Sequence, residues 1–264
     1  NNGRLEVWLA TQAPEPARLA AARALGISLA DVILYPMPAG GSFDRRLDHD
    51  HVIEAALIAR ELGRPVQLVW SRAEEQLALN PRPPVAALVG AKLTQDGRIA
   101  AMRTRIAAPP AGHEFGRRLF GNQTTWSAIA DVAGSSDPIA VEGYAGIYAI
   151  PDQTLYHIPV QIPLPSGRLR GNAHGYTCFI RECFIDEVAH RCDHEPMSFR
   201  VAMLGHDPLL VACLQRAAQL AAWDGGISGS AQGIACHQLQ LGSASGRIAV
   251  VATASVGEGG LRVS

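Results

Sequence analysis

The stretch DVILYPMPAGGSF, residues 31–43, decides how the first part of this chain folds. Its first half, Asp31 to Tyr35, is a short apolar run that predicts a strand. The second half, Pro38 to Ser42, contains a proline and the pair Gly40-Gly41, which end a strand and allow close approach to a backbone. A strand that leads directly into such a loop indicates a mixed α/β layer.

Helices and strands alternate on both sides of this stretch. Leu5, Val7 and Leu9 alternate with other residue types, which predicts a half-buried strand ending at Thr11-Gln12. An alanine-rich helix should follow and end before Gly26, and the apolar face from Val52 to Leu62 predicts another helix that stops at Gly63. Further predicted elements are a strand at 65–70, a hairpin at 85–106 turning at Asp96-Gly97, helices at 174–191 and 208–222, and strands at 233–241 and 248–256.

These elements together predict an α+β fold, with mixed sheets and helices packed on them. We expect a first α/β unit at residues 1–108 and an irregular connection, rich in Gly, Pro and Ser, at 109–165. A second α/β unit should occupy 166–264 and be incomplete at its C-terminus. A chain of 264 residues with 48% hydrophobic side chains can bury cores of that size.

Composition argues against several classes of protein. The net charge is -1, with basic and acidic side chains nearly balanced, so we expect no nucleic-acid partner. No stretch approaches the roughly 20 apolar residues of a membrane span, and the first residues show no export signal. The five cysteines are an odd number, which does not suit a secreted disulfide framework and favours buried thiols. The compartment is left undecided.

The loop at 39–43 has two interpretations. Its position between a strand and a helix would let backbone N–H groups approach an anionic ligand near a positive helix end. A plain tight turn would have the same glycines. The loop is not a Walker loop, because no Gly-Lys-Ser/Thr follows, and it lacks the spacing of a dinucleotide fold. Glycines alone therefore do not identify the ligand.

A set of spaced motifs is more specific than the loop alone. Thr11-Gln12, Leu25-Gly26 and Gly40-Gly41-Ser42-Phe43 follow one another, and Gln12 and Phe43 are 43 - 12 = 31 positions apart. In these motifs and that interval the chain resembles the molybdenum-binding large subunit of the xanthine oxidase family. Other stretches that resemble the family follow in order: Arg45-Arg46, Gly63–Val66, Trp70–Arg72, Glu142-Gly143, Tyr148–Pro151, Arg170-Gly171, Glu182–Glu187 and Glu195–Arg200.

The resemblance covers nearly the whole chain and is strongest to the isoquinoline 1-oxidoreductase beta subunit and related bacterial aldehyde dehydrogenases. It implies a middle fragment of a molybdenum-dependent oxidoreductase, which oxidises an aldehyde or an N-heteroaromatic carbon with water as oxygen source. The implied cofactor is a molybdenum-pterin in its molybdopterin cytosine dinucleotide form. The implied partner is a small subunit that carries iron-sulfur clusters. The fragment alone should not turn over.

The resemblance also implies roles for particular residues. The Gln12 amide would hydrogen-bond a ligand oxygen of the metal, and Gly40, Gly41, Ser42, Phe43 and Gly171 would complete the cofactor-binding set. Arg170 would be catalytic, because a guanidinium on the substrate side can orient substrate and stabilise developing negative charge. No side chain is expected to ligate the metal. The family's general base should lie beyond Ser264, and we expect Glu258 to lie in an ordinary turn.

Two features keep alternatives open. Asp44 stands where the family has glycine and adds a carboxylate beside a site for an anionic group. It is the best support for a second hypothesis, a non-catalytic homologous scaffold or assembly module that has lost the cofactor. His190, Cys192 and His194 have a spacing seen in metal sites, but without a carboxylate pattern an exposed helix end is favoured.

Overall fold

The computed structural model describes residues 3–78, 80–110, 112, 136–164, 166–167, 169–226, 231–241 and 244–264. The chain divides into two compact units. Unit 1 comprises Asn1–Pro84, Pro109–Asp137 and Pro159–Asn172, and unit 2 comprises Val85–Ala108, Pro138–Ile158 and Ala173–Ser264. This grouping differs from the division expected from the sequence, since the hairpin at 85–106 packs with the second unit, where its buried Met102 and Ile106 share a core with helix residues.

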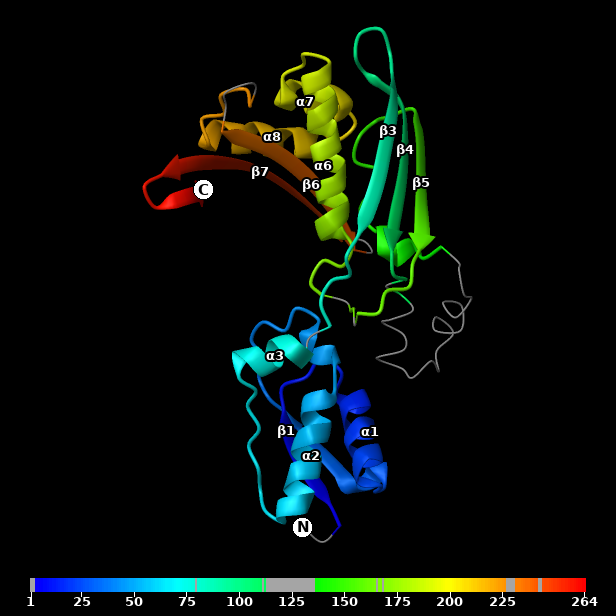
Figure 1. The fold of residues 1–264 in the computed structure, drawn as a ribbon, viewed down its shortest axis with the longest axis vertical. Helices are drawn as coiled ribbons and strands as arrows, with labels where there is room; N and C mark the ends of the chain where they lie inside the picture. The colour runs from blue at the N-terminus through cyan, green and yellow to red at the C-terminus, as the bar shows by residue number, and fades with distance from the viewer. Residues whose placement is uncertain are drawn as a thin grey trace. The chain divides into compact units, whose positions relative to one another are not determined.

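Unit 1 is built around a pair of parallel strands covered by two helices (Figure 1). Strands β1 and β2 pair so that Val7 lies opposite Leu34, and the connection between them is a helix, as parallel pairing requires. Ala17, Ala21, Val52 and other small residues form the core under the two helices. The elements are β1 (Leu5–Leu9), α1 (Pro14–Leu25), η1 (Leu29–Asp31), β2 (Val32–Pro36), η2 (Arg45–Leu47), α2 (Asp50–Leu62) and α3 (Arg72–Ala78).

Both long helices of unit 1 end where the sequence predicted. Gly26 and Gly63 adopt left-handed conformations, with φ of 67° and 62°, and donate their N–H groups to the last turn of α1 and α2. Glycine reaches this conformation without strain, which is why it ends helices so often. These two caps fix where the chain leaves each helix.

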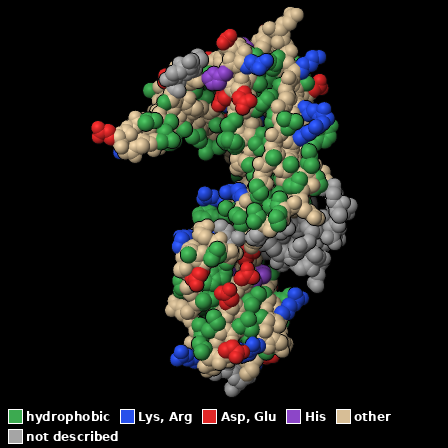
Figure 2. All heavy atoms as spheres, in the orientation of Figure 1, with side chains coloured by type: hydrophobic (Ala, Val, Ile, Leu, Met, Phe, Trp, Pro, Cys, Tyr) green, Lys and Arg blue, Asp and Glu red, His purple; other side chains and the backbone are tan. Residues whose placement is uncertain are grey.

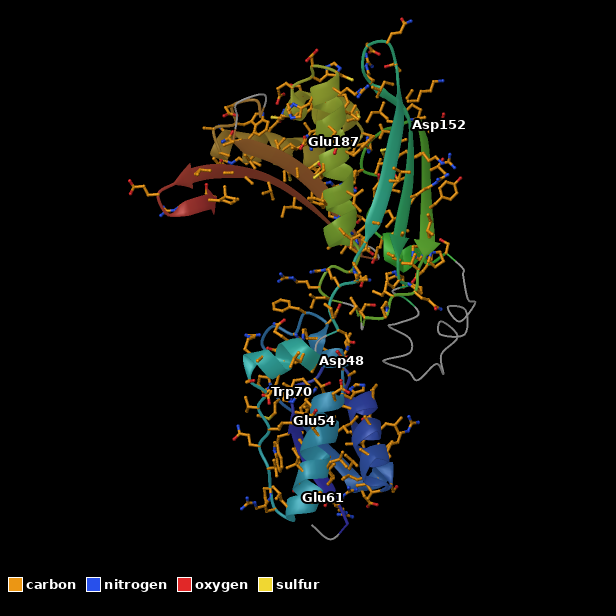
Figure 3. All side chains as sticks on the ribbon, in the orientation of Figure 1. Asp48, Glu54, Glu61, Trp70, Asp152 and Glu187 are labelled. Atoms are coloured by element: carbon orange, nitrogen blue, oxygen red, sulfur yellow. The ribbon has the colours of Figure 1, made fainter. Side chains whose placement is uncertain are left out.

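The strand expected at 65–70 is wrong, because residues 64–71 form no strand ladder. Alternate residues of this segment, Val66, Leu68 and Trp70, are half-buried. Trp70 donates its ring N–H to Glu54 Oε2 on α2 at 2.8 Å (Figure 3). Its ring also meets the His51 ring edge-on. Side-chain contacts of Trp70 therefore hold this end of the segment to α2 without backbone pairing.

Unit 2 contains two three-stranded sheets with helix α6 packed between them (Figure 1). One sheet has the order β3-β4-β5 and the other β6-β7-β8, and α8 packs on β6 and β7. The sequence missed β5 and α7. The elements are β3 (Ala86–Leu93), β4 (Ile99–Ala108), η3 (Pro138–Val141), β5 (Asp152–Pro159), α6 (His174–Arg191), α7 (Pro196–Met203), α8 (Pro208–Leu220), β6 (Gln232–Leu241), β7 (Ala244–Gly257) and β8 (Gly260–Val263).

The expected turns of unit 2 are present. The β3–β4 hairpin turns at Asp96-Gly97, where Gly97 has a φ of 77°. Strands β7 and β8 pair up to Gly257 opposite Gly260, so Glu258 lies in a tight turn, as expected. The α+β fold with mixed sheets is therefore confirmed.

The core of unit 2 contains a buried charge network centred on Glu182. Its carboxylate accepts hydrogen bonds from Arg181 Nε at 3.0 Å, Arg200 Nε at 3.1 Å and the Tyr148 hydroxyl at 2.9 Å. The Cys236 N–H also donates to it, at 3.1 Å. Burial, and then the Glu182 charge, raise the pKa of Tyr148 well above its usual value and that of Cys236 to about 12. The hydroxyl and thiol therefore stay protonated.

A second polar chain adjoins this network. Arg181 Nη2 lies 3.1 Å from His237 Nδ1, and His237 Nε2 lies 2.8 Å from His174 Nδ1. Burial, and then the Arg181 charge, lower the pKa of His237 to about 4. The His237 ring is therefore neutral near pH 7.

The described residues set limits on two other kinds of site. They include no helix that is long and apolar enough to cross a membrane. They also include no cluster of three His, Cys, Asp or Glu side chains that could hold a metal ion, and His190 is exposed at the end of α6. On the face drawn in Figure 2, Lys and Arg side chains are scattered among acidic ones.

Candidate functional site

The end of β1 is tied to the turn η2 of the same unit. The backbone N–H of Gln12 donates to the Arg46 carbonyl at 3.0 Å, and the Thr11 hydroxyl donates to the same oxygen at 3.1 Å. Arg46 in turn donates a side-chain N–H to the Ala10 carbonyl at 3.4 Å. These bonds hold the Thr11-Gln12 motif beside the loop that follows β2. From the sequence, Arg46 was recognised only as part of a motif that resembles the family. The fold shows in addition that Arg46 holds the end of β1 through hydrogen bonds.

The loop from Gly40 to Asp44 turns through left-handed backbone conformations. Gly40, Phe43 and Asp44 have φ of 60°, 53° and 66°. Non-glycine residues adopt such angles rarely, and they do so mostly where a tight local geometry is required. The Ser42 hydroxyl oxygen is buried and makes no hydrogen bond to any described residue. The loop therefore presents a hydroxyl donor that has no partner among the described residues.

The structure brings Gln12 and Asp44 together. Gln12 Nε2 donates to Asp44 Oδ1 at 3.3 Å, and the Gln12 side chain is exposed. A carboxylate accepts hydrogen bonds and cannot donate them, so the NH₂ side of the amide must face Asp44. The residue that departs from the family pattern thus contacts the residue expected to bind the cofactor.

Arg170 also lies at this loop, although it is far away in the sequence. Its backbone N–H donates to the Phe43 carbonyl at 3.0 Å, and its guanidinium carbon lies 4.4 Å from the centre of the Phe43 ring. Gly171 follows in a left-handed turn with a φ of 77°, and no hydrogen bond among the described residues joins it to the loop. Arg168, its neighbour, lies outside the described residues.

A pocket of about 690 Å³ opens beside the loop within unit 1. Its wall includes Ser42, Phe43, Arg45, Arg46, His51 and Trp70. Burial, and then the neighbouring His49, lower the pKa of His51. Gln12 and Arg170 are not in its lining, so the pocket meets the candidate residues at Gly41, Ser42 and Phe43.

The geometry suits an anionic, oxygen-rich group better than a bare cation. It offers the Ser42 hydroxyl, the Gln12 amide, turned backbone amides at 40–44, and three arginines in the pocket wall. Asp44 beside the loop, and Asp48 and Glu75 in the pocket wall, are the opposing charges, and Glu75 pairs with Arg45 and Arg72. These donors fit a pterin cofactor with its phosphate and oxo groups, and none of them is a typical metal ligand.

Comparisons with known proteins agree with this chemistry. Residues 1–114 match the family model of the molybdopterin cofactor-binding domain. The chain is 30% identical, over 224 residues, to the isoquinoline 1-oxidoreductase subunit beta of Brevundimonas diminuta, a match that spans 84% of this chain and 27% of that protein. It is also 30% identical, over 191 residues, to the membrane-bound aldehyde dehydrogenase (pyrroloquinoline-quinone) of Gluconacetobacter polyoxogenes, covering 69% of this chain and 23% of that protein.

Solved structures show the same fold. The quinoline 2-oxidoreductase of Pseudomonas putida 86 aligns with a TM-score of 0.59 at 20% identity, over 89% of this chain and 32% of that one. The chain thus spans about a quarter of the length of the two curated relatives and about a third of this solved chain.

Proposed function

Because the chain belongs to the xanthine oxidase family of molybdenum-binding subunits, we propose that it is part of a molybdenum hydroxylase or aldehyde oxidoreductase. Its substrate would be an aldehyde or an N-heteroaromatic ring, oxidised at carbon with oxygen from water. The names of the two curated relatives, an isoquinoline oxidoreductase and an aldehyde dehydrogenase, support these two substrate classes. The proposed electron acceptor is a partner subunit with iron-sulfur clusters.

One observation carries the proposal. Three stretches that are distant in the sequence meet around the Phe43 loop, since Gln12 bonds Asp44 and Arg170 bonds the Phe43 carbonyl. The family resemblance implies that Gln12 and the loop act on one group, and the two lie within hydrogen-bonding reach of each other in the fold. A plain tight turn would not explain this convergence.

The residues divide the work as follows. Gln12, Ser42 and the backbone amides of residues 40–44 would hold the molybdenum-pterin, for which we propose the cytosine dinucleotide form. When bound, that group supplies two-electron oxidation at a carbon centre. Arg170 would orient the substrate and stabilise negative charge that develops as the carbon is attacked. Gly171 would allow the turn that follows Arg170, since its φ of 77° favours glycine.

The test uses the complete subunit purified with its partner. Molybdenum and pterin are measured per chain, and turnover is measured with a panel of aldehydes and N-heterocycles. We expect about one molybdenum per chain and turnover of at least one class. A properly assembled complex without molybdenum or pterin would reject the proposal.

One structural observation favours the second hypothesis, a non-catalytic scaffold or assembly module without cofactor. Asp44 accepts a hydrogen bond from the Gln12 amide and brings negative charge to a loop that should receive an anion. The same measurement of molybdenum and pterin separates the two hypotheses.

Replacing Asp44 with glycine should raise the molybdenum content or leave it unchanged. The substitution frees the Gln12 amide and removes a repelling charge, and glycine accepts the left-handed φ of 66° without strain. Molybdenum per chain is compared with that of Asp193→Gly, a matched control at a φ of 54° in unit 2. A sharp loss of metal in Asp44→Gly alone would show that Asp44 helps to hold the cofactor.

Replacing Arg170 with lysine should lower kcat about tenfold or more with normal molybdenum content. An ammonium cannot reproduce the planar donor fork, and the charge to be stabilised develops after substrate binding, so KM should change less. Arg60→Lys, at an exposed position on α2, is the control. Equal turnover per molybdenum in the two variants would show that Arg170 is an ordinary surface arginine with no catalytic role.

A further inference from the structure

The Phe43 side chain has no part in the roles above, which use only its backbone. Phe43 is 49% exposed as a residue, yet its ring has neighbours on two sides. A Cβ added to Gly41 would lie 2.7 Å from the ring carbon Cζ, so the ring rests directly on the glycine. The Arg170 guanidinium lies over the ring, at 4.4 Å from its centre. The tip of the ring therefore lies against Gly41, and Arg170 lies over the ring.

The backbone next to this stack is fixed as well. The Arg170 N–H donates to the Phe43 carbonyl at 3.0 Å, and the Arg82 guanidinium donates to the Arg170 carbonyl. The Gly167 N–H donates to the Pro81 carbonyl at 2.9 Å. Main-chain bonds thus place the Arg170 segment on the loop, and the Arg170 side chain lies over the Phe43 ring.

We propose that Phe43 is a positioning residue whose ring holds the Arg170 guanidinium in place. Gly41, which has no side chain, leaves space for the ring, and Arg82 anchors the backbone of Arg170. An arginine side chain has many rotamers, and ordering it costs conformational entropy. Attraction between the cation and the aromatic face offsets part of that cost before substrate arrives. This inference rests on the proposed function, because Arg170 must act on the substrate for its position to matter.

A double-mutant cycle in the complete enzyme tests the coupling. Phe43→Leu should lower kcat/KM per bound molybdenum by about threefold to thirtyfold, while Phe43→Tyr, which keeps an aromatic face, should stay within about twofold of the wild type. In an Arg170→Ala background, Phe43→Leu should cause no further loss. Losses that multiply in the double mutant would overturn the proposal.

Gly41→Ala tests whether the position of the Phe43 ring matters, because it displaces the ring without removing it. The backbone of Gly41 is outside the left-handed region, so alanine is tolerated there, but its Cβ would push the ring away. We expect the same loss as for Phe43→Leu, and no added loss when the two are combined. Gly90→Ala in β3, where a Cβ meets no atom within 4 Å, is the control. Wild-type turnover in Gly41→Ala would contradict the stacking role.

Hydrogen exchange gives a measure independent of turnover. In the complete subunit, amides of residues 169–172 should exchange faster in Phe43→Leu and Arg82→Ala than in the wild type, and Arg82→Lys, which keeps a donor, should restore slow exchange. Unchanged exchange in both Phe43→Leu and Arg82→Ala would overturn the proposal. If the wild-type subunit binds no molybdenum, the proposed function fails, but this measurement still tells whether Phe43 and Arg82 position Arg170.

Discussion

Gln12→Ala in the complete, metal-loaded enzyme is expected to lower turnover by about tenfold to a thousandfold, with little change in stability. The side chain is exposed and its described contact is one hydrogen bond to Asp44, so its removal leaves no cavity in the core. If its amide hydrogen-bonds the reacting group, the bond strengthens as charge develops, and its loss appears in kcat.

Turnover per bound molybdenum is the measurement for Gln12→Ala, and the unfolding temperature is recorded beside it. Gln67→Ala, at an exposed position on the segment that follows α2, is the matched control and should behave as the wild type. Unaltered turnover in a fully metallated Gln12→Ala enzyme would show that Gln12 has no role in the active site. A loss of stability in Gln12→Ala alone would mean that its role is structural.

Glu182→Ala should destabilise the subunit by about 3–5 kcal/mol, the cost of breaking a buried ion pair from one side. Arg181 and Arg200 are 1% and 0% exposed, so neither can recover its lost partner from solvent. Arg200 keeps Asp186 at 2.6 Å, but Arg181 is left with carbonyl acceptors and a histidine ring. The Tyr148 hydroxyl and the Cys236 N–H lose their acceptor as well.

Chemical unfolding of the purified subunit measures this effect. Glu187→Ala is the control, because Glu187 lies exposed on the same helix and its replacement should change the free energy of unfolding by less than about 0.5 kcal/mol (Figure 3). If Glu182→Ala fails to give soluble protein, Glu182→Gln, which keeps the size and one acceptor, should still fold with reduced stability. If the Glu182→Ala subunit is as stable as the Glu187→Ala subunit, the charge network centred on Glu182 contributes nothing to the free energy of unfolding.

The sequence predicted elements whose signals are local. Gly26 and Gly63 end their helices because the left-handed conformation is cheap for glycine, and Asp96-Gly97 turns its hairpin for the same reason. The failures depend on contacts distant in sequence. Trp70 contacts α2 from a segment that pairs with no strand, and β5, which begins with the exposed polar residues Asp152, Gln153 and Thr154, pairs with β4 from a distant part of the chain.

In the candidate site, too, the sequence identified particular residues but not the contacts that they make. The interval between Gln12 and Phe43 is a sequence property, so a resemblance could identify both residues. Their surroundings are not: the bond from Gln12 to Asp44 joins positions 32 apart, and Arg82 reaches Arg170 across 88 positions. No periodicity encodes such distances, because the fold of the intervening chain creates them. The assigned roles of Gln12, Phe43 and Arg170 therefore stay predictions until the variants are measured.

The polar chain through His174 and His237 has one permitted arrangement of hydrogens. A guanidinium only donates, so Arg181 makes His237 Nδ1 an acceptor, and the hydrogen of that ring must sit on Nε2. His237 then donates to His174 Nδ1, which leaves the hydrogen of His174 on Nε2, the atom 3.9 Å from a Glu142 carboxylate oxygen. One arginine therefore sets the tautomer of two imidazoles in succession.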